Sequence, residues 1–413
     1  MSNIKLSPTQ QNAIKQVIHW YKHETKQKQI FRLFGYAGTG KTTLTKLVIE
    51  ELGLNQSRVA FLAFTGKAAL VMQRHGIPAA TIHSSIYKVH EKDRTVYKKL
   101  KAKLKAAKTE AARTEIKRKL ASEKRELQKP IFILDEESPI SDVSLIVLDE
   151  VSMVGEELGN DLLSFQKPIL VLGDPGQLPP IKDLGFFTEH EPDAMLTEIH
   201  RQAAESPIIQ IATMARKGEV IPPIKFSNSV LRTTRQSANP DILLRADQVI
   251  CSRNVTRRKF NTHMKIAAGF HSPYPTGQGE KLICLKNQRS LGLYNGMFLS
   301  LKHIKDLSPI AFSAETTPEF GKKLLQPVPF YKGHFDDYVE PMAERYSQDY
   351  FQIRDNHLVE IDWGYVITCH KAQGSQWKNV VVINEGFGRN RETYARWLYT
   401  AITRAEEGLV ILG

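Results

Sequence analysis

Short runs of apolar residues recur along the chain, and stretches long enough for a helix separate them. The first runs that fit buried strands are residues 30–34, 58–64, 144–149 and 168–173. Helix-like patterns cover residues 9–23 and the stretch that begins at residue 44. Buried strands that alternate with helices are typical of a parallel sheet with helices on both faces, so we expect an α/β fold.

A second series of apolar runs lies at residues 247–252, 364–369, 379–384 and 408–413. It predicts a second parallel sheet of the same kind. Between its parts, residues 286–356 are rich in prolines and aromatic residues and contain the turn sequence YNG. This stretch predicts short antiparallel strands joined by a hairpin turn, and therefore a small β insertion.

Residues 92–129 differ from the rest of the chain, because they contain no glycine or proline and are rich in Ala, Lys, Leu, Arg and Glu. Apolar residues recur there at a spacing of three to four, namely Val96, Leu100, Leu104, Ala107 and Ala111. The pattern predicts one or two charged helices that project from the first sheet.

The net charge of +13 is concentrated in this same stretch. Residues 92–129 carry 15 Lys and Arg against 5 Asp and Glu, which places +10 within 38 residues and leaves +3 for the other 375. The basic character is therefore local, and an even nucleic-acid coat over the whole surface is excluded.

Export and membrane insertion do not fit the sequence. The apolar runs are far shorter than the roughly 20 residues of a membrane span. The N-terminal MSNIKLSPTQQ lacks the basic and apolar regions of a signal peptide. Cys251, Cys284 and Cys369 lie far apart without metal-ligand spacing, which predicts free, buried thiols in a reducing compartment. We expect a cytoplasmic protein of a bacterial cell, encoded by the cell or by a phage.

The segment GYAGTGKTT matches the phosphate-loop pattern G-x-x-x-x-G-K-[ST] and lies between a predicted strand and a predicted helix. Backbone N–H groups of such a loop surround the phosphates, and the N-terminus of the following helix adds positive potential. Lys41 would neutralise the β- and γ-phosphates, and the Thr42 hydroxyl would bind Mg²⁺. The candidate nucleotide-binding residues of this loop are Gly35, Gly38, Thr39, Gly40, Lys41, Thr42 and Thr43.

Polar residues follow the next two predicted strands. Asp149 and Glu150 end the run at residues 144–149, where Asp149 would hold Mg²⁺ and Glu150 would orient or deprotonate the attacking water. The run at residues 168–173 leads into GDPGQLPP, which places Gln177 near the same sheet edge as a candidate γ-phosphate sensor.

Nine motifs, in order, resemble those of superfamily 1 helicases, specifically the RecD-like and Dda-like group (superfamily 1B) that moves 5′ to 3′ on single-stranded DNA. The motifs are LSPTQ, GYAGTGKTT, AFTGKAA, TIHS, LDEVSM, GDPGQLPP, LTEIHRQ, TCHKAQGSQW and YTAITRA. The resemblance covers most of the chain. It implies two RecA-like P-loop motor domains that close on ATP and so change their grip on DNA.

By this resemblance, the first motor domain comprises residues 1–87 and 131–205, and the second comprises residues 206–285 and 357–413. Residues 88–130 would be a basic helical insertion in the first domain. Residues 286–356 would be an SH3-like β insertion in the second domain.

The resemblance also implies roles for single residues. Gln10 would read the adenine, and Arg201 and Arg404 would reach the γ-phosphate from opposite sides of the cleft, where developing charge needs preorganised cations. Gln373 and Gly374 would link the DNA grip to the nucleotide, since a glycine permits close backbone approach. The residues implied to face the DNA strand are Thr65, Lys67, Thr81, His83, Thr368, His370 and Lys371.

The chain departs from the family pattern at residues 92–129, where related helicases carry a small hairpin that parts the duplex. A helical stretch at this position leaves four roles open: an alternative wedge, an arm that grips duplex DNA, a docking site for a partner, and a solvated charged helix.

The expected function is an ATP-dependent 5′-to-3′ DNA helicase that uses ATP and Mg²⁺ and acts as a monomeric motor. Its expected partners are single-stranded DNA and duplex junctions, with replication or recombination proteins as candidate protein partners. A translocase that displaces proteins but unwinds weakly and a DNA loader that uses ATP as a switch are the alternatives. Glu150, Gln177 and the two arginines favour hydrolysis over the loader. Contacts to the backbone alone do not separate DNA from RNA.

Overall fold

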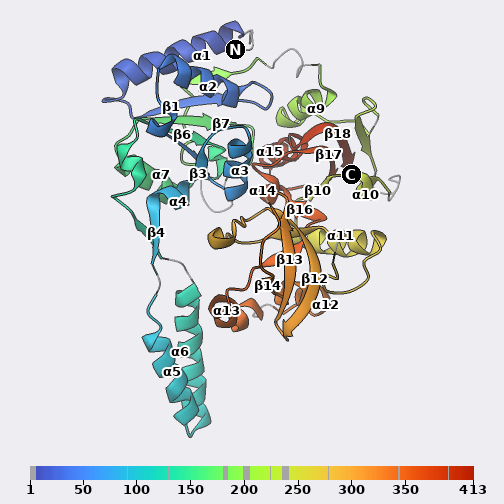
Figure 1. Cartoon of the computed structure of the whole chain (residues 1–413). Helices are drawn as coiled ribbons and strands as arrows, with labels where there is room; N and C mark the ends of the chain where they lie inside the picture. Colours follow the sequence, from blue (N-terminus) through green and yellow to red (C-terminus); the bar gives the residue numbers. More distant parts are fainter. Residues whose placement is uncertain are drawn as a thin grey trace.

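The computed structural model describes residues 6–90, 92–128, 131–179, 185–198, 205–223, 225–234, 241–277, 279–320, 322–342, 345–388 and 390–413. The strands of these residues form two parallel sheets, one antiparallel sheet and one two-stranded ribbon (Figure 1). Within the described ranges, no helix combines the length and the apolar composition that crossing a membrane requires.

The first sheet has six parallel strands in the order β3-β2-β6-β7-β1-β8. Their bounds are β1 Ile30–Gly35, β2 Val59–Ala63, β3 Ala79–Thr81, β6 Leu145–Asp149, β7 Ile169–Gly173 and β8 Ala194–Leu196. The four predicted strands are confirmed as β1, β2, β6 and β7. The sequence does not predict β3 and β8, because three-residue strands are too short to show a hydrophobic period.

Helices cover both faces of the first sheet. They are α1 Pro8–His19, α2 Lys41–Glu51, α3 Gly66–Arg74, α4 Ile82–Ile86 and α7 Glu156–Ser164. The predicted helix at residues 9–23 is confirmed, although its last turn, Trp20–Glu24, is π-helical. Leu145 and Val147 of β6 join the core under α1 and α2, whereas Ile146 and Leu148 join the core under α4 and α7. A strand buried on both faces reads as continuously apolar.

The second sheet has five parallel strands in the order β16-β10-β17-β18-β9. Their bounds are β9 Val230–Thr233, β10 Gln248–Cys251, β16 Val366–Thr368, β17 Trp377–Ile383 and β18 Ala405–Leu412. The helices of this part are α9 Pro207–Arg216, α10 Asp241–Arg245, α11 Asn254–Ala267, α14 Cys369–Ala372 and α15 Arg391–Ile402. The predicted second parallel sheet is confirmed, with β9 as an edge strand that the sequence does not predict.

The third sheet is antiparallel, with the strand order β14-β13-β12-β11-β15. Its elements are β11 Leu282–Cys284, β12 Phe298–Ser308, β13 Ala311–Pro318, β14 Val328–Tyr331, β15 Ile361–Trp363, α12 Gly333–Val339 and α13 Arg345–Asp355. The strands β11 and β15 lie outside the expected bounds 286–356, so the sheet extends further in both directions. The YNG segment forms a turn that returns the chain into β12, and its Gly296 has the positive φ of +88° that favours glycine.

Residues 87–90, 92–128 and 131–134 form an arm that projects away from both parallel sheets (Figure 1). Its elements are β4 Tyr87–His90, α5 Thr95–Ala106, α6 Glu110–Gln128 and β5 Ile131–Leu134. The strands β4 and β5 pair as an antiparallel stem, and α5 and α6 confirm the prediction of charged helices. The expected apolar stripe holds at Leu100 and Leu104 but not at Val96, which is 53% exposed.

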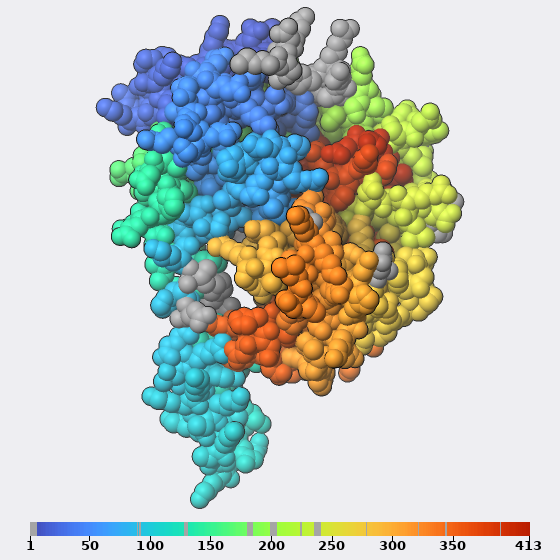
Figure 2. All heavy atoms as spheres, in the orientation of Figure 1, coloured from blue at the N-terminus to red at the C-terminus, as the bar shows by residue number. Residues whose placement is uncertain are grey.

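The base of the arm packs against α13 of the third sheet, and Figure 2 shows the remainder protruding from the body. The ring of Tyr97 lies 4.5 Å from that of Phe351, centroid to centroid. An ion pair of 2.7 Å joins Arg94 to Asp355. The arm is therefore attached at two places, by its stem to the first sheet and by its base to α13.

Candidate ATP site and nucleic-acid surface

Three segments that are distant in sequence meet at one edge of the first sheet. The strands β6, β7 and β1 are parallel neighbours, so their carboxyl ends lie side by side. A cleft of about 730 Å³ opens at this edge and faces the second sheet. Among its lining residues are Gly38, Gly40, Lys41, Thr42, Thr43, Asp149, Glu150, Gln177, Gly374, Thr403 and Arg404. The cleft therefore collects most of the predicted nucleotide-binding and catalytic residues.

The phosphate loop joins β1 to α2. Gly38 and Gly40 have φ values of +79° and +81°, which place their N–H groups in a curled loop that a residue with a side chain would strain. The Lys41 ammonium donates hydrogen bonds to the carbonyl oxygens of Gly35 at 2.6 Å and Tyr36 at 3.2 Å. Lys41 therefore lies across the mouth of the loop, where a β- or γ-phosphate would meet it.

Gln10 connects the start of α1 to this loop. Its side chain is 3% exposed, and its Nε2 donates to the carbonyl oxygen of Thr39 at 3.0 Å. Its Oε1 accepts the N–H of Ser7 at 3.1 Å, as part of the capping box that begins α1. The structure brings Gln10 against the loop, and its role in reading the adenine stays a prediction.

Asp149 and Glu150 form the acidic corner of the cleft. Burial and the nearby charge of Glu150 raise the pKa of Asp149 to about 6, while the Lys41 ammonium and a hydrogen bond with Thr42 act in the opposite direction. Glu150 has a φ of +54°, and its N–H donates to Asp149 Oδ1 at 2.8 Å. A left-handed glutamate costs on the order of 1–2 kcal/mol, and such strain is concentrated at functional sites.

The hydroxyl of Thr42 and the carboxylate of Asp149 fit the Mg²⁺ that P-loop chemistry implies. The two groups are hydrogen-bonded to each other beside Lys41. Mg²⁺ is usually held by one or two protein oxygens together with waters and nucleotide phosphates. A site without phosphate would need more ligands, and in the described part of the chain no cluster of three or more His, Cys, Asp and Glu could supply them.

The second sheet contributes Arg404, which is 4% exposed. Its guanidinium donates to the carbonyl oxygens of Thr400 at 3.1 Å and Ser375 at 3.2 Å and to the Thr403 hydroxyl at 3.1 Å. These bonds hold it at the wall of the cleft opposite the phosphate loop. The other expected arginine finger, Arg201, lies outside the described residues.

Gln177 lies in the turn that follows β7 and is 8% exposed. Its Oε1 is buried and has no hydrogen-bond partner among the residues that the structure describes. A buried acceptor without a partner is costly unless a ligand or water satisfies it. This supports the prediction that Gln177 contacts a group in the cleft.

Some residues beside the first sheet that were expected to face DNA also stabilise the local structure. Thr65 and Thr81 are the N-caps of α3 and α4, with hydroxyls that accept the N–H groups of Ala68 and Ser84. His83 lies among three aromatic rings, and burial lowers its pKa. Their contact with DNA stays a prediction.

Lys67 lies between the two halves of the molecule, namely the first sheet with its helices and the second and third sheets with theirs. It is only 5% exposed. Its ammonium forms an ion pair with Glu319 at 3.0 Å and lies 4.6 Å and 5.2 Å from the ring centroids of Phe298 and Trp377. It also donates to the Gly296 carbonyl oxygen at 3.2 Å. In this conformation Lys67 bridges α3 to the second and third sheets and is not presented to the surface.

Thr368, His370 and Lys371 lie together at the carboxyl end of β16. Burial lowers the pKa of His370, and it lowers that of Lys371 to about 8. Lys371 donates to Asn295 Oδ1 at 2.9 Å, which connects α14 to the YNG turn. The same turn contacts Lys67, so residues from both halves of the predicted DNA surface meet there.

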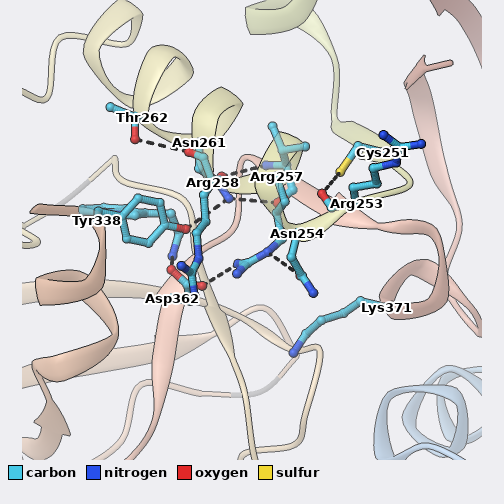
Figure 3. Close-up of polar contacts among 12 residues, drawn as sticks. Cys251, Arg253, Asn254, Arg257, Arg258, Asn261, Thr262, Tyr338, Asp362 and Lys371 are labelled. Atoms are coloured by element: carbon cyan, nitrogen blue, oxygen red, sulfur yellow. Dashed lines mark hydrogen bonds and ion pairs between the residues drawn. The ribbon is translucent and has the colours of Figure 1, made fainter. Parts of the chain in front are cut away.

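A pocket of about 290 Å³ lies beside Lys371 (Figure 3). Its lining includes Thr368 and Lys371 together with Asn254, Arg257 and Arg258 from the first turn of α11. Sequence reasoning missed these α11 residues. The available signal was the basic sequence NVTRRK directly after a predicted parallel strand, since strand carboxyl ends are where ligands bind.

Two family models match the chain, one over more than half of its length and one near its C-terminal end. A family model described as an AAA domain matches residues 5–229. A model described as the UvrD-like helicase C-terminal domain matches residues 364–412.

Two curated relatives are similar to the chain, and so are many solved structures. The chain is 26% identical over 302 residues to the ATP-dependent RecD2 DNA helicase of Deinococcus radiodurans, covering 64% of this chain and 35% of that protein. It is 29% identical over 227 residues to the ATP-dependent DNA helicase dda of Enterobacteria phage T4, covering 52% of this chain and 43% of that protein. The crystal structure of Bacteroides Pif1 bound to single-stranded DNA matches with a TM-score of 0.52 at 16% identity, covering 99% and 92% of the two chains. At that identity it supports the fold alone.

We expect Lys41→Ala to lower ATP turnover in the presence of single-stranded DNA by about 100-fold or more, because a preorganised cation at the transferring phosphate is lost. Lys15→Ala, which removes an exposed charge from α1, should leave turnover unchanged. Steady-state phosphate release measures both variants. Full turnover by Lys41→Ala would contradict the assignment of the phosphate site.

We expect the affinity for single-stranded DNA to fall as the pH rises through 8. Lys371 is charged below its lowered pKa of about 8 and neutral above it, and the charges around it are Asp362 and Arg257, with the Cys284 thiol and the pocket residue His334 nearby. If Lys371 binds a phosphate, affinity should drop by about tenfold between about pH 7 and pH 9.

Lys371→Arg is the matched control, because its guanidinium stays charged across this range. Fluorescence anisotropy with a labelled oligonucleotide at each pH compares the two proteins. Burial also lowers the pKa of Lys281 to about 8. Both proteins contain Lys281, so its titration contributes equally to the two pH profiles. Equal pH profiles would show that Lys371 does not bind the strand.

Proposed function

We propose that this chain, which belongs to the AAA-domain family and to the superfamily 1B helicases of the RecD-like and Dda-like group, uses ATP hydrolysis to move 5′ to 3′ along single-stranded DNA and to unwind duplex DNA. The observation that carries the proposal is the cleft of about 730 Å³ that the phosphate loop and Arg404 line from opposite sheets. A triphosphate bound there would contact both sheets and draw them together.

Hydrolysis would use groups already placed around this cleft. The N–H groups of the phosphate loop and the Lys41 ammonium would bind and orient the β- and γ-phosphates. Glu150 would orient the attacking water and accept its proton, while Gln177 would contact the γ-phosphate. Arg404 would stabilise the charge on the transferring phosphoryl group. Thr42 and Asp149 would hold Mg²⁺, which neutralises phosphate charge when it is bound.

Movement on DNA requires that closure of the cleft changes the grip on the strand. Gln373 follows the predicted DNA-facing residues of α14, and its Nε2 donates to the Leu178 carbonyl oxygen at 3.1 Å in the turn that holds Gln177. A Cβ on Gly374 would lie 3.0 Å from the Cβ of Ala68 in α3. The segment after α14 therefore touches both the nucleotide side and the DNA side of the first sheet, which supports coupling between them.

The strand would run over both parallel sheets, past the N-terminal ends of α3, α4 and α14. Hydroxyls, imidazoles and the Lys371 ammonium suit contacts to phosphates without base specificity. The names of the two curated relatives, and the single-stranded DNA bound by Bacteroides Pif1, support DNA as the substrate. The chain spans less than half of either relative's length, so the activity of the whole protein is part of the proposal.

We propose that the arm contacts the duplex DNA that lies ahead of the bound single strand. Its exposed basic residues include Lys98, Lys99, Lys101, Lys103, Lys105, Lys108, Arg113, Lys117, Arg118, Lys119 and Arg125. Within α5 and α6, the structure records one ion pair, between Lys119 and Glu115. The exposed cations of the arm outnumber its acidic residues, and such cations attract phosphates with release of counterions. The two attachments at the base would hold the arm in a fixed direction.

One observation favours the second candidate function, a translocase that displaces proteins and unwinds weakly. The position of the expected wedge is occupied by two exposed helices rather than by a compact hairpin. Such an arm could grip a duplex without parting its strands.

Strand displacement with ATP and Mg²⁺ tests the function. We expect unwinding of a duplex with a 5′ single-stranded tail and none with a 3′ tail, because the proposed movement is 5′ to 3′. An RNA–DNA hybrid with a 5′ DNA tail tests the choice of strand. ATP turnover on single strands without displacement of any substrate would favour the translocase, and displacement from the 3′ tail would contradict the polarity.

Neutralising the arm should weaken the salt dependence of duplex binding. Each phosphate contact contributes a slope of about −0.9 in log affinity against log salt for duplex DNA and about −0.7 for single strands. We expect Lys101→Gln, Lys103→Gln and Lys105→Gln together to make the duplex slope shallower by about one to three units, and removal of residues 92–129 to flatten it further.

The matched control changes the exposed residues Lys15, Lys22 and Lys26 to Gln. They belong to α1 and the segment that follows it, and α1 lies at the opposite end of the molecule from the arm (Figure 1). Binding to a blunt duplex and to a single strand is titrated between low and moderate salt. An unchanged slope after removal of the arm would mean that the arm does not touch nucleic acid.

A further inference from the structure

The hydroxyl of Tyr399 joins the two halves of the cleft. Tyr399 belongs to α15 beside the second sheet and is 2% exposed. Its hydroxyl accepts the N–H of Ala37 in the phosphate loop at 2.9 Å and donates to Asp174 Oδ2 at 2.7 Å. One atom of the second half thus contacts two catalytic segments of the first.

The turn from Asp174 to Leu178 is bound to the second half at both ends. Tyr399 holds the carboxylate of Asp174 at its start. At the end of the turn, the Thr400 hydroxyl accepts the N–H of Leu178 at 2.9 Å, and Gln373 donates to the carbonyl oxygen of Leu178. The Leu178 side chain is 1% exposed and packs in the core of the second sheet. In this conformation, contacts from the second half therefore hold the turn at both of its ends.

Gln177 lies inside this turn, one residue before Leu178, so the same contacts determine where its side chain points. The fit around Tyr399 is close, because a Cβ on Gly176 would lie 2.9 Å from Cε1 of the Tyr399 ring. The turn is further fixed by a hydrogen bond of 2.9 Å from the Gly176 N–H to Asp174 Oδ1.

The hydroxyl stays protonated and can donate, since burial and the Asp174 carboxylate raise the pKa of Tyr399. Separation of the two halves would leave the Asp174 carboxylate and the Ala37 N–H without this partner. Buried polar groups that lose their partners are costly, so the two bonds favour one relative position of the halves.

We propose that Tyr399 is a positioning residue for ATP hydrolysis, whose hydroxyl aligns the phosphate loop with the turn that carries Gln177 when the two halves are closed. This inference rests on the proposed ATPase function. Its direct consequence is that removal of one oxygen atom should misalign Gln177 without removing any group that touches the nucleotide phosphates.

Tyr399→Phe tests the proposal, and Tyr394→Phe is the matched control. Tyr394 lies on the same helix, but its hydroxyl exchanges hydrogen bonds with Asn384 of the second half alone, at 2.9 Å and 3.1 Å. We expect Tyr399→Phe to lower kcat of ATP hydrolysis on single-stranded DNA by about tenfold and to change KM for ATP by less than about twofold. Tyr394→Phe should keep the wild-type kcat.

A second measurement reports closure without depending on turnover. Donor and acceptor dyes at Lys15→Cys in α1 and Val255→Cys in α11 follow the distance between the halves, because both positions are exposed and the three native cysteines are buried. We expect Tyr399→Phe to reduce the fraction of closed molecules, and to change the Tm by no more than Tyr394→Phe does.

The outcomes separate the inference from the proposed function. A wild-type protein that does not hydrolyse ATP would contradict the proposed function, and the dye distances would still test the contact that Tyr399 makes between the halves. Wild-type kcat and dye distances in Tyr399→Phe would overturn the inference. A parallel fall in kcat, affinity for ATP and Tm would also overturn it, since that pattern indicates a general structural role.

Discussion

The segments that reach the nucleotide from the first sheet all leave it at the carboxyl ends of neighbouring parallel strands. The phosphate loop follows β1, the acidic corner ends β6, and the turn with Gln177 follows β7. Strand order, rather than closeness in sequence, makes them neighbours. Among the described residues that line the cleft, Arg404 comes from the second sheet, so both halves of the molecule form the walls of the cleft.

Several polar contacts join the two halves. Tyr399, Thr400 and Gln373 hold the turn after β7. Lys67 forms a second connection between the halves. Its ammonium pairs with Glu319 and lies beside the rings of Phe298 and Trp377. Polar contacts of this kind have a strict geometry, so they specify one closed arrangement, whereas a smooth apolar interface would allow sliding. Directional contacts of this kind suit the proposed opening and closing of the halves.

The positive charge is distributed unevenly between the body of the molecule and the arm. The body is nearly neutral, and some of its cations are buried in specific contacts, as Lys67 and Arg404 show. The arm carries most of the net charge on exposed side chains. Buried cations fix the positions of the segments they join, because their partners are fixed. Exposed cations act through long-range attraction, which salt weakens. The two groups of cations therefore suit different tasks within one chain.

The sequence alone determined the elements whose signal is local. Continuous apolar runs predicted the central strands of both sheets, because strands buried on both faces need apolar residues throughout. The glycines and Lys41 of the phosphate loop, with Asp149, Glu150 and Gln177 at strand ends, were predicted as one half of an ATP site, and the structure brings them together at one cleft. The charged composition of residues 92–129 predicted helices, and the short strands β3, β8 and β9 escaped because they have too few residues to show a period.

Only the tertiary structure decided which side chains meet across the halves. Lys67, expected at the DNA strand, is enclosed between the first half and the third sheet, and no local pattern indicates its partner Glu319, since the two are far apart in sequence. The α11 residues beside Lys371 and the hydroxyl of Tyr399 are likewise defined by contacts between distant segments. Local patterns report how a segment buries its own surface, and the partner that covers that surface is set by the packing of the whole chain.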